Sequence, residues 1–262
     1  MNYLLELDKW LGFLIVVSVI TLGGLIVVSQ VKKRIQHKIT KQHEKIGRLL
    51  FRVTAGLIAL LLSLSYANEK VEQYKILSSM EREASLIVSA ALKLNLLNSE
   101  ESSIIKRKLV DYVEATISDS WESVRANPFF SVASGLLIEV NKLVYHLPVK
   151  NQNEERIKNY IIEDISEITE LMQVRIYSQN TLTPYLIYIL CIGLVFMWVF
   201  FTVYNLDVIS LSFLSLYNIF IAILIYLIFM LSNPLIGPLK LEPHPFYILK
   251  TKGIDIRLIQ NQ

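Results

Sequence analysis

Four long apolar segments, two near each end of the chain, dominate the hydrophobic pattern. Residues 10–31, 185–204 and 208–231 carry no charge, and residues 49–67 carry only Arg52. About 20 apolar residues in a helix are enough to cross the ~30 Å hydrocarbon core of a bilayer. We therefore predict an all-α integral membrane protein with about four transmembrane helices, arranged two and two around a helical insert.

Two of these segments admit another interpretation. A cleaved signal peptide would carry a basic region before residues 10–31, but acidic residues lie there and the basic run, residues 32–34, follows the segment. Arg52 leaves open that residues 49–67 form a buried soluble helix, although an arginine one turn inside a span can extend to the headgroups. Only a few residues around Asp207 separate the last two segments, which predicts an antiparallel hairpin.

The middle of the chain, residues 69–180, is charged and amphipathic, with 13 Lys and Arg against 17 Asp and Glu. Its apolar residues recur at helical spacing. Two such stripes are Ile105, Leu109, Val113, Ile117, Trp121 and Val124, and Ile157, Ile161, Ile165, Ile168, Met172 and Ile176. We expect four helices, at about 69–97, 100–126, 128–147 and 153–180, the first continuing the second span.

These patterns divide the chain into an N-terminal membrane part (1–67), an extramembrane insert (68–182), a transmembrane hairpin (183–232) and a proline-rich tail (233–262). The tail carries Pro234, Pro238, Pro243 and Pro245. Proline removes a helical hydrogen bond and clashes with the preceding turn. We therefore expect an extended tail that packs against the membrane end of the helices.

Residue types that support enzymatic chemistry are sparse. The single cysteine, Cys191, excludes an intrachain disulfide and a Cys₄ or Cys₂His₂ zinc site. The four histidines form no metal-binding motif, and no phosphate-binding glycine loop or nucleophile elbow occurs. Basic residues of the insert are balanced by acids, which argues against nucleic-acid binding. We predict no enzyme activity, no cofactor and no metal.

The segment between the first two spans is short and basic: residues 32–52 carry eight Lys and Arg against one acid, Glu44. Short basic loops stay in the cytoplasm. We expect a multi-pass cell-membrane protein, in the inner membrane if the source is bacterial, with loop 32–52 in the cytoplasm.

Small residues form one face of the second span: Ala55, Gly56, Ala59, Ser63 and Ala67, with Arg52 at one end. Close helix–helix packing through small side chains is one interpretation. A pore lining is the other, because small, weakly polar side chains leave room for an ion, and Arg52 at the mouth would favour anions. In the last span, a polar cluster predicts interhelical hydrogen bonds: Ser210, Ser212, Ser215 and Asn218. In the first span, Gly23-Gly24 predicts a helix-packing site.

Several short motifs stand within this order of spans, insert, hairpin and tail. They are Glu83-Ala84, Tyr112 and Trp121 in the insert, Arg175 ahead of the third span, and Asn233-Pro234 and Gly237 in the tail, followed by Pro243 and Phe246. With them, residues of about 45–250 resemble the bestrophin-like family. The tail departs from the family pattern at Ser232 and Leu235, where an acid and a phenylalanine are usual.

The resemblance implies a homo-oligomer in a lipid bilayer, and relatives in the wider bestrophin group conduct chloride or other anions through a pore lined by the second span. Those relatives keep the insert and both termini in the cytoplasm, whereas the basic loop predicts the opposite orientation. A different class remains open: a non-conducting membrane protein whose insert binds a partner through the stripe that contains Trp121.

Overall fold

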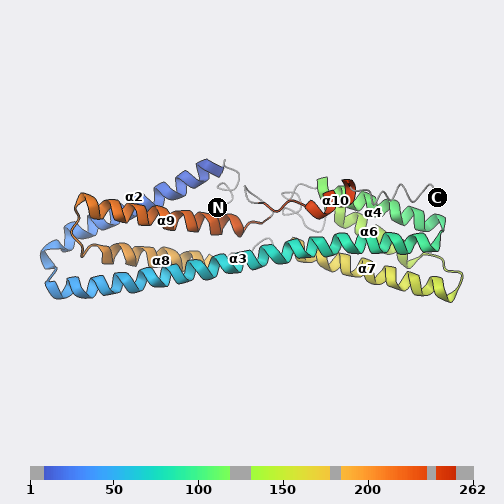
Figure 1. The fold of residues 1–262 in the computed structure, drawn as a ribbon, viewed down its shortest axis with the longest axis horizontal. Coiled ribbons are helices and arrows are strands. Elements are labelled where there is room, and N and C mark those ends of the chain that lie inside the picture. The colour runs from blue at the N-terminus through green and yellow to red at the C-terminus, as the bar shows by residue number, and fades with distance from the viewer. Residues whose placement is uncertain (1–8, 119–130, 178–183, 235–239, 252–262) are drawn as a thin grey trace. The chain divides into compact units, whose positions relative to one another are not determined.

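The computed structural model describes residues 9–118, 131–177, 184–234 and 240–251, and every regular element in these ranges is a helix (Figure 1). The chain divides into two compact units. The membrane unit comprises Met1–Val71 and Asn180–Lys240, and the insert unit comprises Glu72–Gln179 and Leu241–Gln262. One helix, α3 (Lys41–Leu97), contributes its first half to the membrane unit and its second half to the insert unit.

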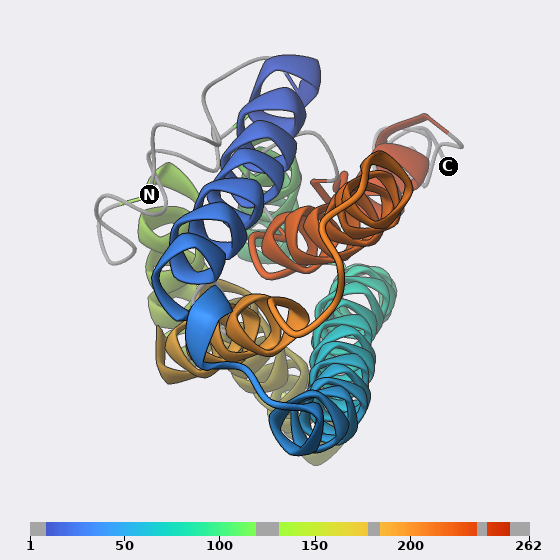
Figure 2. The ribbon, with the colours of Figure 1, turned by 90° about the vertical axis from the view of Figure 1, so that its left-hand side faces the viewer.

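The membrane unit contains α2 (Lys9–Ile35), the short 3₁₀ turn η1 (Gln36–Lys38), the first half of α3, α8 (Pro184–Phe201) and α9 (Val208–Leu231). Helix α2 packs against both α9 and α8, as Figure 2 shows from one end of the unit. The apolar core between these helices includes Val28, Ile58, Leu194, Met197, Trp198 and Leu214. Helices α8 and α9 form the predicted hairpin, and the Asp207 side chain caps α9 by accepting a hydrogen bond from the Ser210 N–H at 3.1 Å.

Three of the described helices are long and apolar enough to cross a membrane: Trp10–Ile35, Lys41–Leu97 and Val208–Leu231. The apolar stretch Tyr188–Phe201 of α8 is shorter. With 18 residues, the whole of α8 is about 27 Å long at 1.5 Å per residue. It ends at Phe201, three residues before the predicted end of the third span.

The insert unit contains the second half of α3, α4 (Glu100–Ser118), α6 (Val132–Tyr145), α7 (Gln152–Tyr177) and α10 (His244–Thr251). The predicted end of the first insert helix is confirmed, because α3 stops at Leu97 and Asn98 follows with φ 42°. Asparagine tolerates this left-handed conformation, which ends a helix. The apolar stripes lie in the core: Ile105, Leu109, Val113, Ile161, Ile165, Ile168 and Met172 are all buried.

Ion pairs join neighbouring helices of the insert unit. Helix α3 pairs with α7 through Arg82–Glu167 at 2.8 Å and Lys93–Asp164 at 2.7 Å. The Arg82 hydrogen bond lowers the pKa of the Glu167 carboxyl. The Arg82–Glu167 pair is exposed and contributes little to stability, whereas Asp164 of the other pair is buried.

The predicted absence of a regular helix in the tail is wrong. Residues His244–Thr251 form α10, which packs against α4. Pro243 and Pro245 do not prevent it, because both lie at the start of the helix, where a missing N–H is tolerated. The N–H groups of Phe246 and Tyr247 donate to the Pro243 carbonyl at 3.0 and 3.2 Å, and so close the first turn.

Candidate functional site

The membrane half of α3 has two contrasting faces besides its small-residue face. The buried face carries Ile58 and Leu62, which are 2% and 3% exposed, and Ile58 lies against Gly193 of α8. Another face carries large aliphatic side chains that no described residue covers, including Leu57, Leu60 and Leu64. The helix therefore uses one face for its own subunit and leaves the rest of its circumference open.

The predicted pore-lining residues lie between these two faces. Gly56, Ala59, Ser63 and Ala67 are exposed, and Ala55 is half-buried. A methyl group added at Gly56 would meet no described atom within 4 Å. A lining for a pore and a contact for another subunit both need such an open face, so the two interpretations made from the sequence both fit this geometry.

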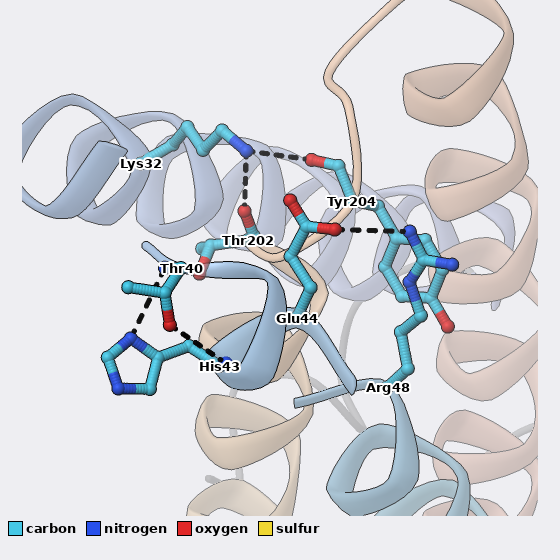
Figure 3. A network of polar contacts seen from close by, with 7 residues as sticks. All are labelled: Lys32, Thr40, His43, Glu44, Arg48, Thr202 and Tyr204. Carbon is cyan, nitrogen blue, oxygen red and sulfur yellow. Dashed lines mark hydrogen bonds and ion pairs between the residues drawn. The ribbon is translucent and has the colours of Figure 1, made fainter. Parts of the chain in front are cut away.

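Polar contacts gather where the end of α2, the residues that follow α8 and the start of α3 meet (Figure 3). Lys32 donates from its Nζ to the carbonyl oxygens of Thr202 at 2.8 Å and Tyr204 at 2.9 Å. These carbonyls follow the last turn of α8, where no helical N–H remains to satisfy them. The Arg48 guanidinium lies 5.4 Å from the centre of the Tyr204 ring and 3.7 Å from the Glu44 carboxylate. Arg52, one turn further along, is exposed.

His43 takes part in the capping of α3. His43 and Thr40 exchange hydrogen bonds at the start of α3, each backbone N–H donating to the other's side chain at 3.4 Å (Figure 3). This arrangement caps the helix, as Ser or Thr with a partner three residues later commonly does. Within the described residues, no group of three or more His, Cys, Asp or Glu side chains could hold a metal ion.

The packing site predicted at Gly23-Gly24 lies where α2 crosses α8 and α9. A side chain added at Gly24 would clash with Asn218 and with the Trp198 ring, whereas one at Gly23 would make an ordinary contact with Trp198 at 3.8 Å. Trp198 donates from its indole Nε1 to the Asn218 Oδ1 at 3.0 Å. The interhelical hydrogen bond predicted for Asn218 is confirmed.

The hydroxyls of two neighbouring serines instead donate within their own helix. Ser212 and Ser215 donate their hydroxyls to the carbonyls of Val208 and Leu211 in their own helix, both at 2.8 Å. A serine hydroxyl reaches the carbonyl four residues earlier without any partner helix. The Ser210 backbone N–H donates to the Asp207 cap.

A buried polar cluster joins four elements of the insert unit. Glu83 on α3 is fully buried and accepts a hydrogen bond from Arg175 Nη1 of α7 at 2.8 Å. The Tyr112 hydroxyl of α4 donates to the other carboxylate oxygen of Glu83. The Arg175 guanidinium also lies 5.4 Å from the ring centre of Phe246, which is fully buried on α10. Three residues that the sequence motifs singled out, Glu83, Tyr112 and Arg175, therefore form one cluster.

Burial dominates the ionisation of this cluster. It raises the pKa of the Glu83 carboxyl, and the charge of Arg175 and the hydrogen bonds from Tyr112 and Arg175 offset only part of this. Burial and the adjacent Glu83 both raise the pKa of the Tyr112 phenol. Burial lowers the pKa of Arg175, but Glu83 and Tyr112 together outweigh burial, so that the pKa is raised overall. Tyr112 and Arg175 thus occupy both carboxylate oxygens of Glu83 in the interior of the insert unit.

The remaining motif residues lie near the end of α9 or outside the described ranges. Asn233 donates from its Nδ2 to the Phe229 carbonyl at 2.9 Å and so closes the last turn of the helix, and Pro234 after it is buried. Trp121 and Gly237 lie outside the described residues.

The comparisons with known proteins agree with the helical architecture and its motifs. A family model described as the Bestrophin-like domain matches residues 15–246. No curated protein and no solved structure matches the chain significantly. The matched region includes every described membrane helix except the first turns of α2, together with the whole buried cluster. This protein is therefore a membrane protein of the bestrophin-like family.

Proposed function

We propose that this chain forms an oligomeric anion channel in which α3 lines the pore. The observation that supports this most directly is the open small-residue face of α3, residues Ala55, Gly56, Ala59, Ser63 and Ala67, in a family whose wider group contains anion channels. In an oligomer this face would surround the axis. The exposed aliphatic face, with Leu57, Leu60 and Leu64, would then contact lipid or a neighbouring subunit.

The charge near this face favours anions. Within the described part of α3 between Phe51 and Ala67, Arg52 is the one charged side chain, and it is exposed at the end of the small-residue face. A positive charge at a pore mouth raises the local concentration of anions and lowers that of cations. Small side chains beyond it would let an ion pass without a strong binding site.

The proposed topology has four spans, with α8 as the third. Its length of about 27 Å is within a few ångströms of the hydrocarbon thickness, and a small mismatch is accommodated by local thinning of the bilayer. The basic segment 32–52 would lie on the cytoplasmic side of a cell membrane, the inner membrane in a bacterium.

The alternative, an interaction protein that docks a partner on the stripe of α4, has less support. Ile105, Leu109 and Val113, three residues of that stripe, are 1%, 0% and 6% exposed. They fill the core of the insert unit and present no surface to a partner.

An Ala59→Trp substitution tests the pore assignment. The indole would fill the open face, so we expect reconstituted Ala59→Trp protein to lose chloride flux from liposomes while its oligomeric mass in detergent stays that of the wild type. Leu60→Trp is the matched control, because Leu60 is the next residue and lies on the aliphatic face. Equal flux from the two variants, with the oligomer intact, would show that this face does not line the pathway.

A further inference from the structure

A basic stripe precedes the small-residue face of α3 on the same side of the helix. Lys41, Lys45, Arg48 and Arg52 follow one another at spacings of four, three and four residues, and Ala55, Ala59 and Ser63 continue at three, four and four. With 3.6 residues per turn, such spacings keep all seven positions in one narrow stripe along the helix. The cationic positions therefore lead directly into the proposed pore face.

The charges of this stripe are poorly neutralised. All four side chains are exposed. Arg48 is held by Glu44 and by the Tyr204 ring, whereas Lys41, Lys45 and Arg52 have no ion pair with any described residue. Glu44 is also the single acid of the whole segment 32–52. The stripe thus presents at least three uncompensated cations in each subunit.

The dimensions of the stripe suit a vestibule better than a single binding site. From Lys41 to Arg52 the helix rises about 16 Å at 1.5 Å per residue, which is longer than the contact surface of a small anion. Around an oligomer axis, each position would become a ring of like charges. Rings in series attract mobile counter-ions and repel ions of the same sign without holding either tightly.

We infer that the basic stripe of α3 is the selectivity element of the channel, a vestibule that admits small inorganic anions such as chloride and excludes cations. This inference rests on the proposed function and deepens it, because it assigns ion selectivity to Lys41, Lys45 and Arg52 and leaves conduction to the small residues beyond them. A unit charge at about 7 Å in water changes the local concentration of a monovalent ion about threefold. Loss of three cations in each subunit should therefore lower the chloride-to-potassium permeability ratio at least about tenfold.

The test compares two triple variants that remove the same charge. Lys41→Gln/Lys45→Gln/Arg52→Gln neutralises the stripe. The control, Lys33→Gln/Arg34→Gln/Lys38→Gln, neutralises three exposed cations of the same segment that lie on α2 and η1. Permeability ratios come from reversal potentials of the reconstituted full-length protein in bilayers of zwitterionic lipid under a potassium chloride gradient. The stripe variant should conduct with a ratio reduced at least about tenfold, and the control should stay within about twofold of the wild type.

Ionic strength provides a second measurement on the wild type. Screening shortens the Debye length from about 10 Å at 0.1 M salt to about 3 Å at 1 M, so the chloride preference should weaken as salt rises. A single Lys45→Glu variant should also lower the chloride-to-potassium permeability ratio. It changes one exposed residue, so it disturbs the start of α3 less than the triple variant does.

The outcomes separate the inference from the function on which it rests. Anion-selective flux that is unchanged in the stripe variant, or reduced equally in the control, would overturn the selectivity assignment and leave the channel in place. Absence of flux from the wild-type oligomer would overturn the proposed function and this inference with it.

Discussion

The buried pair of Glu83 and Arg175 makes a quantitative prediction for the Arg175→Met variant. Methionine keeps much of the volume of arginine but removes its charge. Glu83 would then remain fully buried with only the Tyr112 hydroxyl as a donor. A buried ion pair that loses one partner is strongly destabilised, because the remaining charge has neither water nor a counter-ion.

The expected loss is about 3–5 kcal/mol in the free energy of unfolding. This range applies without a large discount for solvent, because the side chains of Arg175 and Glu83 are 5% and 0% exposed. For a protein of this size, 1 kcal/mol shifts the melting temperature by about 2–4 °C. The melting temperature of the variant should therefore fall by about 6–20 °C at neutral pH.

The pH dependence has a definite sign. Burial already raises the pKa of Glu83, and Arg175 is the largest influence that lowers it, so its removal raises the pKa further. Below about pH 4.3, the pKa of an unfolded glutamate, the carboxyl is protonated in both states and the folded state bears no buried charge. As pH rises towards the raised folded pKa, the variant loses stability. The gap to the wild type should be wider at pH 8 than at pH 5.

Thermal unfolding of the detergent-purified protein, followed by intrinsic fluorescence, measures both effects. The double variant Glu83→Gln/Arg175→Met is the matched control, because it removes both charges and leaves a neutral amide to accept the Tyr112 hydrogen bond. It should recover at least about half of the loss. A melting temperature of Arg175→Met within about 2 °C of the wild type would refute the electrostatic reasoning. So would a double variant whose loss of stability equals the sum of the losses of the single variants Glu83→Gln and Arg175→Met.

Two further substitutions test packing in each unit. Gly24→Ala should destabilise the membrane unit by about 1–3 kcal/mol through overpacking against α8 and α9. Gly23→Ala is the control and should be tolerated. Thermal unfolding of both variants in one detergent compares them, and equal losses of stability would contradict this packing. Phe246→Ala should lower the free energy of unfolding by about 3–5 kcal/mol and expose the tail to limited proteolysis, because Phe246 is fully buried. Tyr247→Ala is the control, because Tyr247 is 41% exposed. Equal cleavage of the two variants would show that Phe246 does not anchor the tail.

Length and periodicity predicted the helical architecture because both depend on local sequence. The long apolar segments became α2, the first half of α3 and α9, and the apolar stripes became the core of the insert unit. Helix α10 escaped prediction for a reason that is also local. Pro243 and Pro245 predict a helix break if only their presence is considered. Both lie at the start of α10, however, where proline is compatible with a helix.

Contacts between distant residues follow no local rule. Glu83 and Arg175 are 92 residues apart, and Lys32 lies 170 residues from the Thr202 carbonyl that it binds. The resemblance to a family selected Glu83, Tyr112 and Arg175 as motif residues, but only the packing of α3, α4 and α7 shows that they form a single cluster. No pattern around Lys32 distinguishes it from Lys33 and Arg34, which follow it.

The basic stripe is a different case, because its signal lies in the sequence itself. Counted as a loop, residues 32–52 show only an excess of positive charge, which predicts topology. The part of this segment from Lys41 onward belongs to α3. In that helix, three unpaired cations lie in line with Ala55, Ala59 and Ser63. The structure adds only the starting point of that helix, about two turns before the apolar segment at Leu49. Since the helix continues unbroken through both segments, the charge and the small-residue face belong to one surface, and they should be tested as one.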